Sequence, residues 1–225
     1  MDDRLLVCQA RYNVYALLQR LYQSPPDRDL LDWLIAERPF REFPFELEGA
    51  AAALDQLDRG AREQSLDDLR RDFNRLFIGP GAMLAPPWES VYRNEDHLLF
   101  DQHTLQVREF YARHGMEFVK LNQVPEDSIA IELEFMKVLT ERLLRALETA
   151  DSTAERLLLQ EQQQFLQQHL LVWSPKFITL TQKGAETAFY HGLAGVLGGF
   201  LSWEDQTLKL LLEHVEDIVP AATGG

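Results

Sequence analysis

Apolar residues recur along most of this chain at intervals of three and four, which is the period of an α-helix. Val14, Leu18 and Leu21 lie on one face of such a helix, and the strongest stripe runs over 66–77 and stops just before Gly79. We find no convincing strand pair, repeat or low-complexity tract. The pattern therefore predicts an all-α fold, a multi-helix bundle of roughly nine to eleven helices of ordinary length.

The same pattern gives approximate boundaries for the other elements. Asp27, after two prolines, is placed to begin a helix. Residues 38–45, "RPFREFPF", are expected to form a loop. The further segments predicted as helical are 50–57, 102–114, 151–171, about 176–183, 185–201 and 204–218.

Residues 116–127 contain one proline and no helical stripe. We interpret them as a connector, and as a possible hinge, between an N-terminal helical part (1–115) and a C-terminal one (128–220). The whole chain is treated as one domain, 1–225.

One predicted helix differs from the rest because apolar residues occupy nearly its whole circumference. It follows the acidic start at 125–128 and runs through "IAIELEFMKVLTERLLRAL". A helix that is apolar all round is a buried, central one. Glu132 points inward on this helix, whereas Glu134 and Lys137 share a narrow polar strip. A buried carboxylate needs a partner, for which an arginine or a backbone group is the structural interpretation and a functional role the alternative.

Composition narrows the class of protein. The formal net charge is −14, which disfavours nucleic acid and attracts cationic partners. The single cysteine, Cys8, lies among apolar residues and is read as a buried thiol. The first residues lack the pattern of a signal peptide, and no apolar stretch approaches membrane-spanning length. We therefore expect a cytoplasmic protein without insertion into a membrane.

Motifs of catalysis are missing from the sequence. We find no H-E-x-x-H or E-x-x-H pattern, no phosphate-binding or dinucleotide-binding loop and no G-x-S-x-G. The six histidines are scattered, and His97 and His103 are interpreted as surface residues and not as a metal site. The sequence predicts neither a metal site nor an enzyme, although all-α enzymes often lack short signatures.

The stretch "LFIGPGAMLAPPWESVY", residues 76–92, interrupts the helical pattern. Its prolines fix φ and remove backbone donors, so the segment is suited to lie against apolar surface. Trp88 and Tyr92 offer apolar faces with polar tips, a composition typical of peptide-contact surfaces. The alternative is that both rings only cover the core.

Two blocks of this sequence, "LFIGPG" with "PPWESVY" and "NQVPEDSIAIELEFM", resemble the TorD/DmsD family of redox-enzyme maturation chaperones, which is related to NarJ. The resemblance implies a cytoplasmic, all-helical chaperone. It would bind the twin-arginine leader peptide, the apo-form, or both, of a molybdenum-containing oxidoreductase, and prevent export until the cofactor is inserted. The peptide-binding residues that it implies are Leu76, Phe77, Pro86, Pro87, Trp88, Ser90, Tyr92, Pro125, Glu126, Asp127 and Ser128. Ser128 stands where the family usually has histidine, and can still cap a helix.

A twin-arginine leader has a cationic start followed by an apolar segment. We therefore expect the two blocks to converge into an apolar patch rimmed by Glu89, Glu95, Asp96, Glu126 and Asp127. Most of the affinity should come from the apolar segment and the selectivity from the charges.

Other interpretations stay open. A NarJ-like assembly factor would bind a non-exported subunit, and an unrecognised all-α enzyme would use Glu132. The protein is a monomer or a domain-swapped dimer. No cofactor is expected, although family resemblance allows a guanine nucleotide.

Overall fold

The computed structural model describes residues 3–93, 102–116 and 125–218. These ranges are all-α, as predicted, with no strand beyond one isolated bridge. In chain order the elements are α1 (Asp3–Gln23), α2 (Arg28–Glu37), α3 (Ala51–Glu63), α4 (Leu66–Phe77), α5 (Glu89–Arg93), α6 (Gln102–Arg113), α7 (Ile129–Glu148), α8 (Ser152–Phe165), the π-helical turn η1 (Leu166–Leu170), α9 (Leu171–Gly184) and α10 (Ala188–Ile218). Because α8, η1 and α9 are continuous, the described ranges hold nine separate helices.

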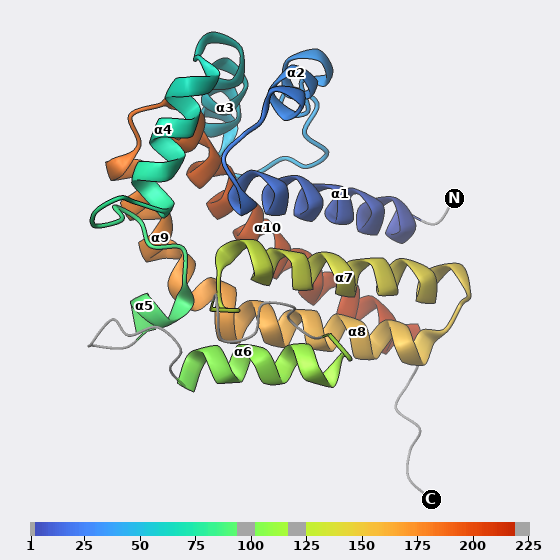
Figure 1. Ribbon diagram of the computed structural model, residues 1–225. Helices are drawn as coiled ribbons and strands as arrows, with labels where there is room; N and C mark the ends of the chain where they lie inside the picture. Colours follow the sequence, from blue (N-terminus) through green and yellow to red (C-terminus); the bar gives the residue numbers. More distant parts are fainter. Residues whose placement is uncertain (1–2, 94–101, 117–124, 219–225) are drawn as a thin grey trace, which may run out of the picture.

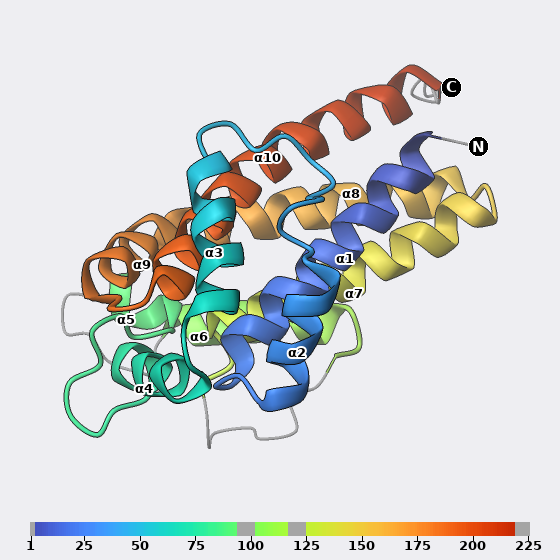
Figure 2. The ribbon, with the colours of Figure 1, turned by 90° about the horizontal axis from the view of Figure 1, so that it is seen from above.

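The long helices form the body of the molecule. Helices α1, α7 and α8 lie side by side, and α10 runs behind them (Figures 1 and 2). Helices α2, α3 and α4 gather at one end, where α3 packs along α10 (Figure 2). None of the described helices combines the length and apolar character that a membrane span requires.

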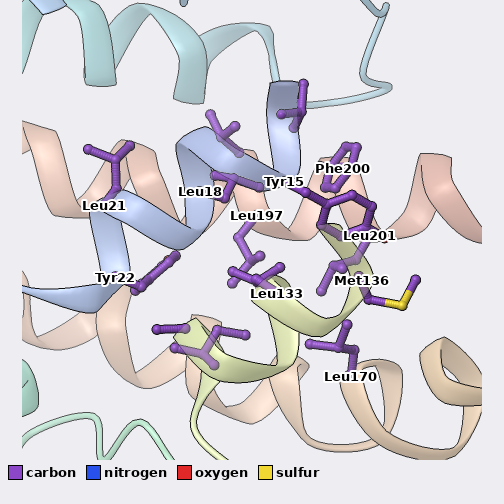
Figure 3. Close-up of a cluster of buried hydrophobic side chains, with 14 of the residues drawn as sticks. Tyr15, Leu18, Leu21, Tyr22, Leu133, Met136, Leu170, Leu197, Phe200 and Leu201 are labelled. Carbon is purple, nitrogen blue, oxygen red and sulfur yellow. The ribbon is translucent and has the colours of Figure 1, made fainter. Parts of the chain in front are cut away.

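The core is continuous across these helices. Tyr15 and Leu18 of α1 meet Leu133 and Met136 of α7, with Phe200 of α10 behind them (Figure 3). Helix α7 is central and buried, as its apolar circumference predicted. The Cys8 thiol is buried too, and burial raises its pKa.

Side-chain caps begin several helices where the sequence predicted them. Asp27 accepts the Leu30 N–H at the start of α2, at 2.8 Å. Ser128 accepts the Ile131 N–H at the start of α7, at 3.4 Å. These caps satisfy backbone donors that have no partner inside the helix. Ser128 therefore caps the start of α7, as the sequence predicted.

Two predicted helix breaks are wrong. We expected interruptions at 171–176 and at 201–204, but the chain stays helical through both. Pro175 lies inside α9, between the fully buried Trp173 and Phe177. A proline inside a helix costs about 3 kcal/mol, and the burial of two large aromatic residues beside it offsets that cost.

Glycines of α10 make room for α3. A Cβ added at Gly192 would come within 2.6 Å of the Ala53 carbonyl oxygen, and one at Gly195 within 2.6 Å of the Ala53 side chain. The glycines of α10 therefore allow α3 to pack closely against this helix. The contact with α3 stabilises α10, and the helix continues through its glycines. The predicted hinge is not tested, because 117–124 lie outside the described residues.

Candidate functional site: the junction of two distant sequence blocks

The two blocks that carry the family resemblance meet in space, as we predicted. Trp88 lies opposite Ser128 in an isolated antiparallel bridge. Two backbone hydrogen bonds hold it, both of 2.9 Å, and one runs from the Glu89 N–H to the Asp127 carbonyl oxygen. The junction joins α5 to the start of α7.

Asp127 organises the start of α5. Its Oδ2 accepts the Ser90 backbone N–H at 2.7 Å. Burial raises the pKa of Asp127, and the hydrogen bond from Ser90 partly offsets this rise. The Asp127 carboxylate is fully buried. Its hydrogen bond therefore stabilises the backbone at the start of α5.

Glu126 ties the same turn to α6. Its Oε1 lies 2.8 Å from Nη2 of Arg108. The Tyr111 hydroxyl donates to the Glu126 carbonyl oxygen at 3.1 Å. Helix α6 is therefore held to the junction by an ion pair and by a buried hydrogen bond.

Glu89 pairs with two cationic or ionisable groups. Its Oε1 is 2.5 Å from Nη1 of Arg93, one turn along α5. Its Oε2 is 2.9 Å from Nδ1 of His169, a residue of the π-helical turn η1. The His169 ring stacks on Phe165, with centroids 4.9 Å apart. Since a carboxylate accepts, the Nδ1 atom carries the proton that is donated to Glu89. A π-helical turn frequently marks a functional site.

Glu132 lies at the centre of this arrangement, fully buried as its helical position predicted. The expected arginine or backbone partner is wrong. Instead, Oε2 accepts the indole N–H of Trp173 at 3.1 Å, and the other side of the carboxyl group faces Glu89. Burial, followed by the charge of Glu89, raises the pKa of Glu132 well above its usual range. The Oε1 atom has no hydrogen-bond partner among the described residues, and the raised pKa favours the protonated form of this carboxyl group.

The predicted site residues divide by burial. The fully or almost fully buried ones are Leu76, Phe77, Ser90, Pro125, Glu126 and Asp127. The half-buried ones are Pro86, Pro87, Trp88, Tyr92 and Ser128.

The expected rim of negative charge is wrong where the structure describes it. Glu89, Glu126 and Asp127 are all fully buried, because each has partners inside the junction. Glu95 and Asp96 lie outside the described residues. Whether the residues at this junction bind a peptide stays a prediction.

An apolar groove opens beside the junction. It has a volume of about 650 Å³ and lies between residues 83–92 and α9. Pro86 and Tyr92 belong to its lining, together with Leu84 and Leu180, and Lys176 is its charged lining residue. Tyr92 also stacks on the buried Trp173, with centroids 5.4 Å apart. Tyr92 therefore both covers the core and lines the groove, so the two alternatives for it are compatible.

Buried polar atoms without a hydrogen-bond partner gather at the junction. Within the described ranges those at the junction are Trp88 Nε1, Ser90 Oγ, Tyr92 OH, Glu126 Oε2, Asp127 Oδ1 and Glu132 Oε1. Folded proteins leave few such atoms, and each needs an explanation. The junction thus keeps donors and acceptors that water or a bound polar group can satisfy.

Sequence reasoning missed the partners of these carboxylates. Arg108, His169 and Trp173 come from α6, η1 and α9, and no local pattern links them to Glu126, Glu89 or Glu132. The only available signal is the spacing of Phe165, His169 and Trp173 at intervals of four, which places all three on one buried helix face.

His103 is buried, so its expected place on the surface is wrong. Its neighbour in that prediction, His97, lies outside the described residues. Among the described residues, no three His, Cys, Asp or Glu side chains are grouped closely enough to hold a metal ion.

The fold and the junction define an all-helical protein with an apolar groove beside a buried, acid-rich turn. The sequence profile of the nitrate reductase delta subunit family matches residues 45–179. That match covers more than half of the chain, so the protein belongs to this family, as the resemblance indicated.

Curated relatives match over most of their length. The chain is 29% identical to the chaperone protein TorD of Vibrio atlanticus over 92% of this chain and 99% of that one. It is 29% identical to the Tat proofreading chaperone DmsD of Salmonella typhi over 76% and 77% of the two chains. Among solved structures, a redox enzyme maturation protein of Archaeoglobus fulgidus matches at 20% identity with a TM-score of 0.48, over 88% of this chain and 93% of that one.

Proposed function

We propose that this protein is a system-specific chaperone of a molybdenum-containing oxidoreductase. It binds the twin-arginine leader peptide, the apo-form, or both, and holds the precursor in the cytoplasm until the cofactor is inserted. It acts by binding and not by turnover. The observation that carries the proposal is the match to a chaperone named TorD over 92% of this chain and 99% of that one.

The geometry of the junction supports binding to an apolar segment of the client. The groove beside residues 83–92 is predominantly apolar and has Leu84 and Leu180 on its walls. Its position on proline-stiffened backbone keeps its shape before the client arrives, which lowers the entropic cost of binding. With Lys176 as its charged lining residue, it suits an uncharged stretch of the client.

The proposal is tested with the purified full chain and a precursor of a molybdoenzyme, prepared with and without its leader. Isothermal titration calorimetry should show saturable binding to the precursor, and a cytoplasmic pull-down should retain it before cofactor insertion. The matched control is a precursor of the same length with a scrambled leader. If the chain binds neither the leader nor the apo-form, the proposal is rejected.

A second candidate is an assembly factor for a molybdoenzyme subunit that is not exported. The description of the matching family, nitrate reductase delta subunit, favours it. An equal affinity for the apo-form with and without a leader would favour this alternative. A loss of affinity on removal of the leader would favour the first.

A further inference from the structure

The apolar groove between residues 83–92 and α9 carries a positive charge. Lys176 lines it, together with neutral side chains such as those of Tyr92, Thr179 and Leu180. Helix α5, at the end of the segment 83–92, packs against α9 (Figure 1). Among the described residues, no acidic side chain lines the groove. The groove therefore combines apolar walls with an amine.

Neither wall supplies a carboxylate that could neutralise Lys176. Helix α9 contains no aspartate or glutamate, so the lysine has no acidic partner three or four residues away on its own helix. The opposite wall, 83–92, contains one acid, Glu89, which is fully buried and paired inside the junction. Glu186 follows α9 but pairs with Arg75, at 3.0 Å. The Lys176 ammonium group is thus exposed and forms no ion pair with the described residues.

The charge of the groove is opposite to that of the molecule. The net charge of the chain is −14, which attracts cations to the surface in general. At physiological salt, exposed charges act over about 8 Å, so Lys176 dominates inside the groove that it lines. A basic residue that enters the groove loses its water and meets a like charge, and both effects oppose binding. An acidic residue loses its water too, but it meets an opposite charge.

We propose that Lys176 determines the charge specificity of the groove by excluding basic residues from the client segment that occupies it. The arginines of a twin-arginine leader then lie outside the groove, and its apolar segment lies inside. Repulsion of this kind hardly weakens binding of the correct segment, because that segment is uncharged. This inference rests on the proposed function, which supplies the client segment. The structural alternative is that the carbon chain of Lys176 only covers apolar surface, which predicts no charge preference.

The first test compares three synthetic peptides that bind the full chain. Each has two arginines followed by a segment rich in leucine and alanine, and one central position of that segment is glutamine, lysine or glutamate. Calorimetry at low salt should show about threefold tighter binding of the glutamate peptide than of the lysine peptide. Added salt should bring the two affinities together. The net charge of the chain favours the opposite order, so this order identifies a local positive charge.

The second test changes the lysine. Lys176→Gln keeps the carbon chain but removes the charge, and should make the affinities for the lysine and glutamate peptides about equal. Lys176→Glu should reverse the order, with the lysine peptide bound about threefold more tightly. The matched control is Lys183→Gln, which removes an exposed lysine of the same helix that does not line the groove. This control should leave the preference of the natural chain unchanged.

The outcomes separate the inference from the proposed function. If the glutamine peptide binds but the natural chain does not prefer the glutamate peptide, the inference fails and the proposed function stands. The same conclusion follows if Lys176→Gln leaves the preference in place, or if Lys183→Gln removes it equally. If no peptide binds while the apo-form without a leader is retained, leader binding and the inference fail together, and the assembly-factor function is favoured. The comparison of peptides on the natural chain needs no variant, and each variant is compared only when its thermal melting is unchanged.

Discussion

Two of the groups of buried charged side chains in the described part of the chain differ in how their charge is balanced. In the helical core, Arg11 donates three hydrogen bonds to Glu204: Nε to Oε1 at 3.1 Å, Nε to Oε2 at 2.9 Å and Nη2 to Oε1 at 2.5 Å. Gln162 accepts from Arg11 at 2.6 Å, and Tyr15 donates to Glu204 at 2.9 Å. The group draws on α1, α8 and α10, and the charge of its arginine equals that of its carboxylate.

The junction contains more carboxylates than cations. Glu89, Glu126, Asp127 and Glu132 are fully buried there, while the two guanidinium groups are only partly buried and belong to Arg93 and Arg108. The comparison teaches that buried carboxylates can be held in different ways. In the core an equal cation balances the carboxylate, whereas at the junction the partners are partly buried arginines, a backbone N–H and, for Glu132, an indole N–H together with a raised pKa. The charge of the junction therefore depends on pH, and that of the core pair does not.

The largest expected effect comes from breaking the balanced pair. Arg11→Met leaves Glu204 buried without its cation, and should lower the free energy of unfolding by about 3–5 kcal/mol. The measurement is urea denaturation followed by circular dichroism. The double variant Arg11→Met with Glu204→Leu should recover most of the loss, because both charges are then removed. Equal destabilisation in the single and double variants would contradict the balanced-pair interpretation.

The next effect is a pH dependence that belongs to the junction. Burial and Glu89 raise the pKa of Glu132 in the folded protein, so the folded state binds more protons than the unfolded one. The contribution of Glu132 to stability is therefore lost as pH rises from about 4.3, the usual pKa of glutamate, toward the raised value. The slope reaches about 1.4 kcal/mol per pH unit.

Glu132→Gln tests this dependence because an amide mimics the protonated carboxyl group and can donate to Glu89. The stability of the variant relative to the natural chain should increase as pH rises, measured by urea denaturation at several pH values. Glu134→Gln, which removes a partly exposed carboxyl group from the same helix, is the matched control. A stability difference that is constant with pH would show that Glu132 keeps no proton in the folded protein.

The balanced pair should not show this pH dependence. Burial acts to lower the pKa of Arg11, but the carboxylate of Glu204 outweighs it and holds that pKa above its usual value. The guanidinium group therefore stays charged throughout the range in which Glu132 titrates. The double variant Arg11→Met with Glu204→Leu, which leaves neither charge in the core, should consequently shift the whole stability profile and leave its dependence on pH in place.

Sequence reasoning found the elements of both regions but not their partners. The apolar period placed Glu132 inside α7, and the caps at Asp27 and Ser128 could be read from local residue types. The partner of Arg11 lies 193 residues away in sequence, and that of Glu132 lies 41 residues away. Periodicity specifies which face of a helix is buried, whereas the pairing of two buried faces depends on packing that no single segment contains.

The sequence predicted that the two blocks meet, but it did not predict that their acidic residues are buried. The resemblance identified two blocks, and the structure joins them at Trp88 and Ser128. The expected exposure of Glu126 and Asp127 was wrong because acidic residues are usually exposed, and only the tertiary arrangement supplies Arg108 and the Ser90 N–H.

The smallest expected effect concerns two roles of Asp127, as the hydrogen-bond acceptor at the start of α5 and as a negative charge. Asp127→Asn keeps an oxygen for the Ser90 N–H and removes one negative charge from a site that holds several. Its stability should therefore stay within about 0.5 kcal/mol of the natural chain, the range of a substitution that breaks no cap or buried pair. Asp127→Ala removes the acceptor as well and should cost about 1 kcal/mol, typical for loss of a cap. Thermal denaturation of both variants near neutral pH makes the comparison. If the asparagine variant proves as unstable as the alanine variant, the carboxylate charge itself, and not the acceptor that it provides, holds the junction together.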